Sequence, residues 1–130
     1  MAHPNEEITR NGYAAFVKGD MDGVAALLAP EVVWHVLGAN VLSGDYRGAE
    51  QTLQFLGRLV EITGGTLRLE IHDVLANDEH AVALVHVRAE RAGRTYDANE
   101  AHVTHIRDGR ITEFWAVSTD QQAFDELLKA

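Results

Sequence analysis

The chain has 130 residues, the length of one domain, with 11 Lys and Arg against 20 Asp and Glu and a formal net charge of −9 at pH 7. Hydrophobic residues at 46% and charged residues at 24% are ordinary globular values, which excludes wholesale disorder. A surface this acidic repels phosphate backbones and anionic lipids, so we expect neither nucleic acid nor membrane as a partner. The lack of cysteine excludes disulfides and thiolate chemistry. Because no signal pattern or membrane-spanning run is evident, we expect a cytoplasmic protein.

The first half of the chain predicts helices with one strand between them. Apolar residues at helical spacing indicate a first helix over residues 5–18, which Gly19 ends. Asp20 can cap a second helix, which Pro30 would close. A β-branched and aromatic strand follows, then a Gly- and Asn-rich loop, then a third helix with an apolar stripe. The expected ranges are 21–28 for the second helix, 32–36 for the strand, 37–47 for the loop and 48–62 for the third helix.

The second half changes to a period of two, which is typical of strands. Leu67, Leu69 and Ile71 alternate with polar residues, and turn sequences separate three further strands, the clearest being Asp108-Gly109. The expected strands after the first are 80–91, 94–107 and 110–118, with a last helix at 120–129. Thr119 and Gln122 fit a capping box for that helix, and Asp120 also suits a cap. Helices followed by an antiparallel meander predict an α+β fold, with helices covering a curved sheet around a pocket.

Short motifs in a fixed order carry a family resemblance. They are GDMDG at residues 19–23, LLAP at 27–30 leading into VVWHV at 32–36, Ser43-Gly44, Gly93-Arg94, and DGRI at 108–111 followed by Trp115. Over about residues 5–118 the chain resembles the SnoaL-like, ketosteroid-isomerase-like branch of the nuclear-transport-factor-2-like (NTF2-like) superfamily. The resemblance implies an NTF2-like cone, a curved antiparallel sheet wrapped by three helices around an internal pocket, with residues 1–130 as one SnoaL-like domain. It does not fix a reaction, because this fold hosts isomerases, cyclases, hydrolases and binding proteins.

The catalytic positions of the relatives transfer only in part. The resemblance places the general-base aspartate of ketosteroid isomerases at Val36 and their oxyanion-hole tyrosine at Gly12, with Tyr13 about 100° further round the helix. Their protonated aspartate falls at His102, which can donate or accept a proton. The acid of SnoaL-type polyketide cyclases falls at Ala116. The resemblance therefore argues against authentic ketosteroid isomerase activity.

Side-chain alternation along the strands predicts what faces the pocket. Glu100 and His102 share one strand face about 6.5–7 Å apart at the base, where they could share a bound water or substrate atom. The expected walls are mostly small and apolar, as in many ligand sites. The predicted ligand-binding residues are Gly12, Phe16, Trp34, Val36, Val85, Val87, Phe114 and Ala116.

We predict that His102 is the main acid–base group and Glu100 its proton partner, acting on a small hydrophobic, carbonyl-bearing molecule. The chemistry would be isomerisation, dehydration or cyclisation, and no cofactor fingerprint accompanies it. Two alternatives stay open at this point. The pair could be a hydrogen-bonded element of the core, or the chain could be a non-catalytic binding or dimerising accessory module that has lost the family's acids.

The opposite sheet face is expected to carry His35, His86 and His105 together with Trp115. These histidines lack the tight spacing of metal ligands, so we predict no metal site. A mixed polar and aromatic face of this kind suits an interface. Because the convex face commonly pairs subunits in this superfamily, the resemblance implies a homodimer through the outer sheet face. Tyr46, in the loop before the third helix, could cover the pocket mouth or anchor the loop, and we favour anchoring.

Overall fold

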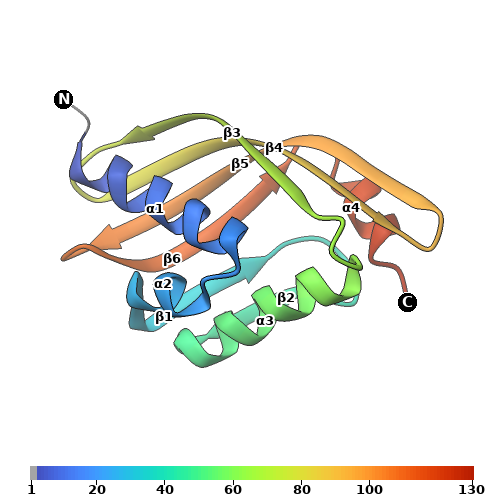
Figure 1. Cartoon of the computed structure of the whole chain (residues 1–130), viewed down its shortest axis with the longest axis horizontal. Coiled ribbons are helices and arrows are strands. Elements are labelled where there is room, and N and C mark those ends of the chain that lie inside the picture. The colour runs from blue at the N-terminus through green and yellow to red at the C-terminus, as the bar shows by residue number, and fades with distance from the viewer. Residues whose placement is uncertain (1–2) are drawn as a thin grey trace.

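The computed structural model describes residues 3–130 and has the predicted α+β architecture (Figure 1). Its last three strands have the predicted bounds, and so does the third helix. In chain order the elements are α1 (Pro4–Lys18), α2 (Met21–Ala26), β1 (Leu28–Val36), β2 (Gly44–Arg47), α3 (Gly48–Ile62), β3 (Arg68–Ala76), β4 (His80–Arg91), β5 (Arg94–Arg107), β6 (Arg110–Ser118) and α4 (Gln121–Leu127).

One six-stranded sheet runs through the molecule in the order β2-β1-β6-β5-β4-β3. Strands β3 to β6 form the predicted antiparallel meander, whereas β1 pairs with β6 in parallel, which makes the sheet mixed rather than antiparallel throughout. The predicted loop at 37–47 was partly wrong, because β2 lies within it and pairs with β1, with Trp34 opposite Tyr46. The Tyr46 hydroxyl donates a hydrogen bond to the Leu42 carbonyl oxygen at 2.7 Å, so this side chain anchors the loop.

The junction between α2 and β1 also differs from the prediction. Helix α2 ends at Ala26, and Pro30 lies inside β1 instead of closing the helix. The pairing of β1 with β6 shifts register between Leu28 and Val33, around this proline. Proline has no N–H to donate to the ladder and is tolerated where a ladder is irregular. The proline in the sequence suggested the end of a helix and did not indicate that β1 already begins at Leu28.

Helices α1, α2 and α3 lie on the same side of the curved sheet (Figure 1). The last helix, α4, contacts β5 and β6. The cap of α4 is Asp120, whose carboxylate accepts a hydrogen bond from the Ala123 N–H at 3.1 Å. The predicted Thr119 capping box is therefore wrong, and the alternative interpretation of Asp120 as a helix cap is confirmed. No helix among residues 3–130 is long and apolar enough to cross a membrane.

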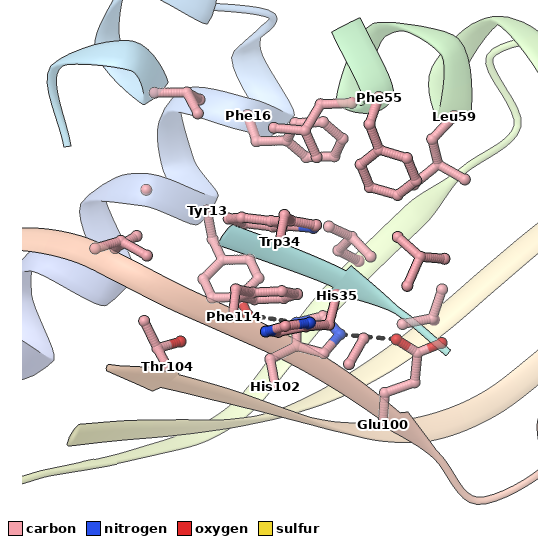
Figure 2. Close-up of a pocket in the computed structure, with 18 of the residues that line it drawn as sticks. Tyr13, Phe16, Trp34, His35, Phe55, Leu59, Glu100, His102, Thr104 and Phe114 are labelled. Atoms are coloured by element: carbon pink, nitrogen blue, oxygen red, sulfur yellow. Dashed lines mark hydrogen bonds and ion pairs between the residues drawn. The ribbon is translucent and has the colours of Figure 1, made fainter. Parts of the chain in front are cut away.

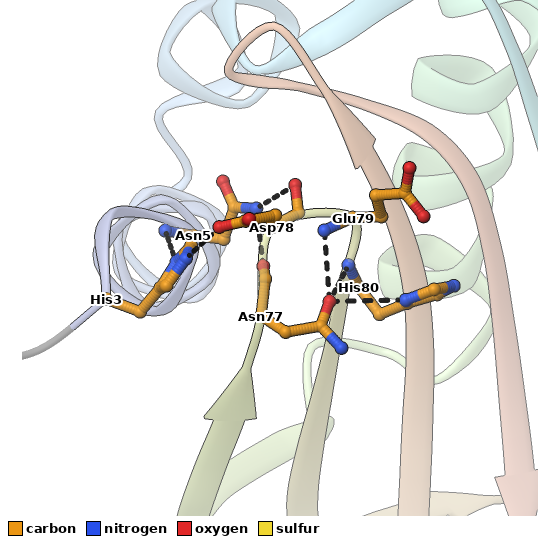
Figure 3. Close-up of polar contacts among 6 residues, drawn as sticks. All are labelled: His3, Asn5, Asn77, Asp78, Glu79 and His80. Carbon is orange, nitrogen blue, oxygen red and sulfur yellow. Dashed lines mark hydrogen bonds and ion pairs between the residues drawn. The ribbon is translucent and has the colours of Figure 1, made fainter.

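Polar contacts fix the start of α1 against the turn between β3 and β4 (Figure 3). The buried Asn5 amide donates to the carbonyl oxygens of Asn77 and Asp78, at 2.8 and 3.1 Å. His3 caps the helix by accepting from the Asn5 N–H, and its other ring nitrogen lies 2.9 Å from the Asp78 carboxylate. At the other end Gly19 terminates the helix in the left-handed region, with φ of 76°. These contacts set which side chains of α1 face the sheet.

Candidate ligand-binding and catalytic site

A cavity of about 150 Å³ lies between the inner face of the sheet and helices α1, α2 and α3 (Figure 2). Its walls are almost entirely apolar. They include the predicted Gly12, Phe16, Trp34, Val36, Val87, Phe114 and Ala116, and also the apolar face of α3 with Phe55, Leu56 and Leu59. The sequence pattern had marked that stripe of α3 as apolar, but the pattern does not say whether such a stripe meets a cavity or a filled core.

Val85 does not line the cavity, contrary to the prediction. It is 2% exposed and lies within the hydrophobic core, opposite Glu100 in the pairing of β4 with β5. Val87, one inward-facing position further along the strand, is part of the wall. Alternation predicts correctly which side chains of a strand face inward. Whether an inward side chain borders the cavity or packs in the core depends on the helical layer above it.

Trp34 and Phe114 form one wall of the cavity as a stacked pair. Their ring centroids are 3.7 Å apart and their planes are inclined by 9°. The parallel pairing of β1 with β6 places the two residues directly opposite each other. The Phe114 ring also meets His102 edge to face, at a centroid distance of 5.2 Å. The stack therefore fixes an aromatic surface beside the polar groups of the cavity.

Glu100 and His102 are buried and joined directly, as their shared strand face predicted. His102 Nε2 lies 2.7 Å from Glu100 Oε1, and the side chains are 8% and 9% exposed. Both residues line the cavity. A carboxylate hydrogen-bonded to one nitrogen of an imidazole orients the ring and favours its charged form.

Tyr13 completes the arrangement, and its position was not predicted. Its hydroxyl is hydrogen-bonded to His102 Nδ1, and the two rings stack at a centroid distance of 5.7 Å (Figure 2). Both Gly12 and Tyr13 line the cavity, so a rotation of about 100° round the helix does not remove the tyrosine from the site. The side chain of Tyr13 is long enough to reach the cavity from this position.

The chain of hydrogen bonds continues beyond Glu100 through residues that the sequence analysis missed. The fully buried Tyr96 donates its hydroxyl to Glu100 Oε2 at 2.8 Å and is hydrogen-bonded to Ser118. Ser118 Oγ in turn accepts from the Asp120 N–H at 3.0 Å. Tyr96 lies four residues before Glu100 on β5, so the same alternation applies to it, but the predicted inner face did not extend as far as Tyr96.

Comparison with known proteins identifies the family of this chain. Residues 9–114 match the family described as SnoaL-like domain. This chain belongs to the SnoaL-like domain family. An uncharacterized protein of Mycobacterium tuberculosis is 34% identical over 122 residues, which cover 91% of this chain and 93% of that protein. The family assignment agrees with the resemblance inferred from the sequence motifs.

Solved structures support the NTF2-like fold of this SnoaL-like chain. Bal32a, from a soil-derived mobile gene cassette, is 31% identical with a TM-score of 0.93, and each chain is 97% covered. An NTF2-like protein of unknown function from Burkholderia pseudomallei is 26% identical with a TM-score of 0.83, covering 99% of this chain and all of that one. TerC, co-crystallized with polyporic acid, is 26% identical with a TM-score of 0.84, covering 98% of this chain and all of that one.

In the SnoaL-like chain one placement of hydrogens gives every group of the site a partner. An ionised Glu100 accepts from His102 Nε2–H and from the Tyr96 hydroxyl, and a neutral His102 accepts the Tyr13 hydroxyl at Nδ1. Burial, with the negative charge of Glu100 as a second cause, raises the pKa of Tyr13 well above its usual range. Burial likewise raises the pKa of Tyr96. Both tyrosines therefore keep their protons and act as donors at neutral pH.

The outer face of the sheet carries a separate set of interactions. His35 lies between the carboxylates of Asp45 and Glu113, 2.7 Å from each, and stacks on Trp115 with centroids 4.8 Å apart. His105 is 3.3 Å from Glu113. Within residues 3–130 no group of three or more His, Cys, Asp or Glu side chains is arranged to hold a metal ion. These histidines are engaged with carboxylates on the protein surface.

Proposed function

We propose that the cavity binds a small hydrophobic, carbonyl-bearing molecule, and that Tyr13, His102 and Glu100 carry out acid–base chemistry on it without a cofactor. The observation that supports this is the hydrogen-bonded chain of these three residues at the wall of an otherwise apolar cavity. An apolar site with a few convergent polar groups is the usual form of a small-molecule site. The reaction would be of the isomerase, cyclase or lyase type.

The roles of the three residues follow from their hydrogen bonds. When His102 does not accept it, the Tyr13 hydroxyl hydrogen can be directed at a ligand oxygen, which stabilises the negative charge that develops on a carbonyl when a neighbouring carbon loses a proton. His102 exchanges a proton with Tyr13, and Glu100 orients the imidazole and stabilises its charged form. Tyr96 positions Glu100 by donating to its second oxygen.

The size of the cavity limits what can enter it. A cavity of about 150 Å³ is the size that holds a single benzene ring. The similar protein TerC was co-crystallized with polyporic acid, which supports a small organic ligand for this chain as well. We therefore propose that one ring of the ligand enters the cavity, with a carbonyl directed at Tyr13.

A non-catalytic binding module is the second candidate. Val36 and Ala116 line the cavity at the positions where the sequence resemblance places the relatives' catalytic carboxylates, and neither can exchange a proton. A protein of this kind would retain the pocket and bind the same class of ligand without forming product.

A thermal-shift screen followed by a turnover assay separates these candidates. Monocyclic and larger hydrophobic ketones are tested with the wild type, His102→Leu, Tyr13→Phe and the matched control Arg10→Ala, an exposed residue also on α1. An enzyme gains stability with one ligand class and converts it, and the two site variants lose conversion by at least tenfold while the control does not. A binding module gains stability without product. The proposal is overturned if no ligand in these classes stabilises the wild type.

We further propose that two copies of the chain pair through the outer face of the sheet. Leu84, Ala101 and Val117 lie side by side across β4, β5 and β6, and Leu84 and Val117 are 37% and 47% exposed. Val103 and Trp115 continue this apolar surface at the adjacent outward positions. The set Leu84, Ala101, Val103, Trp115 and Val117 is called the outer patch below. An apolar centre with polar histidine and carboxylate groups at its edge is the usual anatomy of a protein interface.

A further inference from the structure

The hydrogen-bonded chain in the cavity has two ways of arranging its protons, and they present different groups to a ligand. This inference rests on the proposed function, because it concerns which ligands the same cavity takes. Three side chains of this hydrogen-bond network matter here. Tyr13 Oη reaches His102 Nδ1, and His102 Nε2 reaches Glu100 Oε1. Each member can hold or pass a proton, and each is buried or lines the cavity.

The first arrangement has one proton fewer. Glu100 is ionised, so it can only accept, and His102 must donate to it from Nε2. Its Nδ1 then carries a lone pair and accepts the Tyr13 hydroxyl. The hydroxyl hydrogen of Tyr13 is donated to His102 and is not available to a ligand. What Tyr13 presents to the cavity is therefore a lone pair, which suits a ligand that donates, such as a phenol or an enol.

The second arrangement has one proton more, shared by His102 and Glu100. Nδ1 carries hydrogen when the extra proton lies on the imidazole, or on the carboxyl oxygen Oε1 that faces Nε2, because the space between Nε2 and Oε1 holds only one. Nδ1–H donates to Tyr13 Oη, so the hydroxyl hydrogen of Tyr13 no longer points at His102 and is free to point into the cavity. Tyr13 then presents an O–H donor to the cavity, which suits a ligand that only accepts, such as a ketone.

We propose that uptake of one proton by the His102–Glu100 pair reverses the Tyr13 hydroxyl and changes the cavity from a hydrogen-bond acceptor to a hydrogen-bond donor. The binding of a carbonyl compound is then linked to proton uptake, and the binding of a hydroxyl compound is not. By linkage, a ketone binds more tightly as the pH falls, and a bound ketone draws a proton into the pair.

Most side chains around His102 cannot titrate. The titratable side chains that face it are Tyr13 from α1 and Glu100 from its own strand, with Tyr96 behind Glu100. From β4 and β6 its register partners are Ala83 and Ala116, and Phe114 presents only a ring edge. His35 on β1 also lines the cavity, but its two ring nitrogens are hydrogen-bonded to Asp45 and Glu113 and not to Tyr13. The reversal of the Tyr13 hydroxyl therefore depends on the His102–Glu100 pair, to which Tyr13 is bonded.

The test compares phenol and cyclohexanone, which have the same number of heavy atoms and differ in whether the oxygen donates. Their affinities are measured by NMR titration between about pH 5.5 and 8.5, a range in which phenol itself keeps its proton. We expect cyclohexanone to lose at least tenfold in affinity as the pH rises, and phenol to change by less than threefold. Because each ligand is compared with itself across pH, their difference in shape does not matter.

Three variants test which residues cause the pH dependence of cyclohexanone binding. Tyr13→Phe removes the group that reverses and makes cyclohexanone binding independent of pH. His102→Asn cannot take up a proton and has the same result. His80→Ala removes an exposed histidine at the β3–β4 turn and keeps the wild-type dependence.

The outcomes distinguish this inference from the proposed function. If cyclohexanone binds the wild type with the same affinity at every pH, or if the dependence persists in Tyr13→Phe, the inference is overturned while the ligand site stands. If the folded wild type binds neither compound at any pH and no larger ketone stabilises it, the proposed function fails and the inference fails with it.

Discussion

The hydroxyl of Tyr13 on α1 is hydrogen-bonded to Nδ1 of His102 on β5, 89 positions later in the chain. This bond connects the helical layer to the sheet across the cavity, so the rotation of α1 about its axis decides whether the site has a phenolic donor. The same helix is fixed at its start by Asn5, which bonds to the turn between β3 and β4. Secondary structure and site geometry are coupled through this one helix.

Tyr13→Phe should destabilise the protein without changing its fold. The substitution keeps the ring but leaves the buried His102 Nδ1 without its donor, and an unsatisfied buried polar group costs about 1–3 kcal/mol. Urea unfolding followed by circular dichroism measures the difference. Arg10→Ala, which breaks only an exposed pair with Glu6, should stay within about 0.5 kcal/mol of the wild type. Equal stability of Tyr13→Phe and the control would mean that the bond to His102 contributes nothing.

Alkaline pH should destabilise the protein through its buried tyrosines. Because burial raises the pKa of Tyr13 in the folded state, the unfolded chain releases that proton above about pH 10 while the folded chain keeps it. The free energy of unfolding then falls by about 1.4 kcal/mol per pH unit for such a group, and below pH 10 the group has no effect. Urea unfolding between pH 8 and 11 should show a shallower fall for Tyr13→Phe. A fall of the same slope in both proteins would contradict the buried, protonated tyrosine.

Asn5→Ala should weaken the attachment of α1 to the sheet. The substitution leaves the carbonyl oxygens of Asn77 and Asp78 without the buried amide that bonds them, and the expected loss is about 1–3 kcal/mol. Because α1 carries Tyr13, ligand affinity should fall as well, although residue 5 does not line the cavity. Urea unfolding and a ligand titration test the two effects. A loss of stability with unchanged ligand affinity would show that the helix keeps its position without this contact.

Stability on the acidic side should depend on His35. Burial opposes the charged form of His35, but hydrogen bonds and charges from Glu113 and Asp45 together raise its pKa. A raised folded-state pKa stabilises the protein fully below the unfolded value of about 6.5, and this stabilisation is lost as the pH rises through the folded value. His35→Asn should therefore lose more stability at pH 5.5 than at pH 8.5, as judged by urea midpoints. A loss that is equal at both pH values would argue against a charged His35.

Val117→Glu should separate the proposed dimer into single chains. The substitution places a charge in the centre of the outer patch, where pairing would bury it without a partner. Light scattering after size-exclusion chromatography gives the mass directly. The matched control Val17→Glu, at a position on α1 that is 66% exposed, should leave the dimer intact. A wild type with the mass of one chain at high protein concentration would refute pairing through this face.

The order of helices and strands could be predicted because it depends on local signals. Period-two alternation and the turn at Asp108-Gly109 gave the bounds of β4, β5 and β6, and an apolar stripe gave α3. The failures occurred where neighbours in space override local preference. Pro30 was expected to end a helix but lies in a strand with irregular pairing to β6, and β2 forms only because β1 is available to pair with it.

Local sequence was enough to assign the family, the α+β class and the pairing of Glu100 with His102, because residues two apart on a strand must share a face. The three-dimensional arrangement was needed to show that Tyr13 joins them, that Tyr96 supports Glu100, and that Val85 lies outside the cavity. These relationships depend on the rotation of α1 against the sheet and on the depth of packing between the layers. Both are set by contacts between segments that are distant in the chain, which no local spacing encodes.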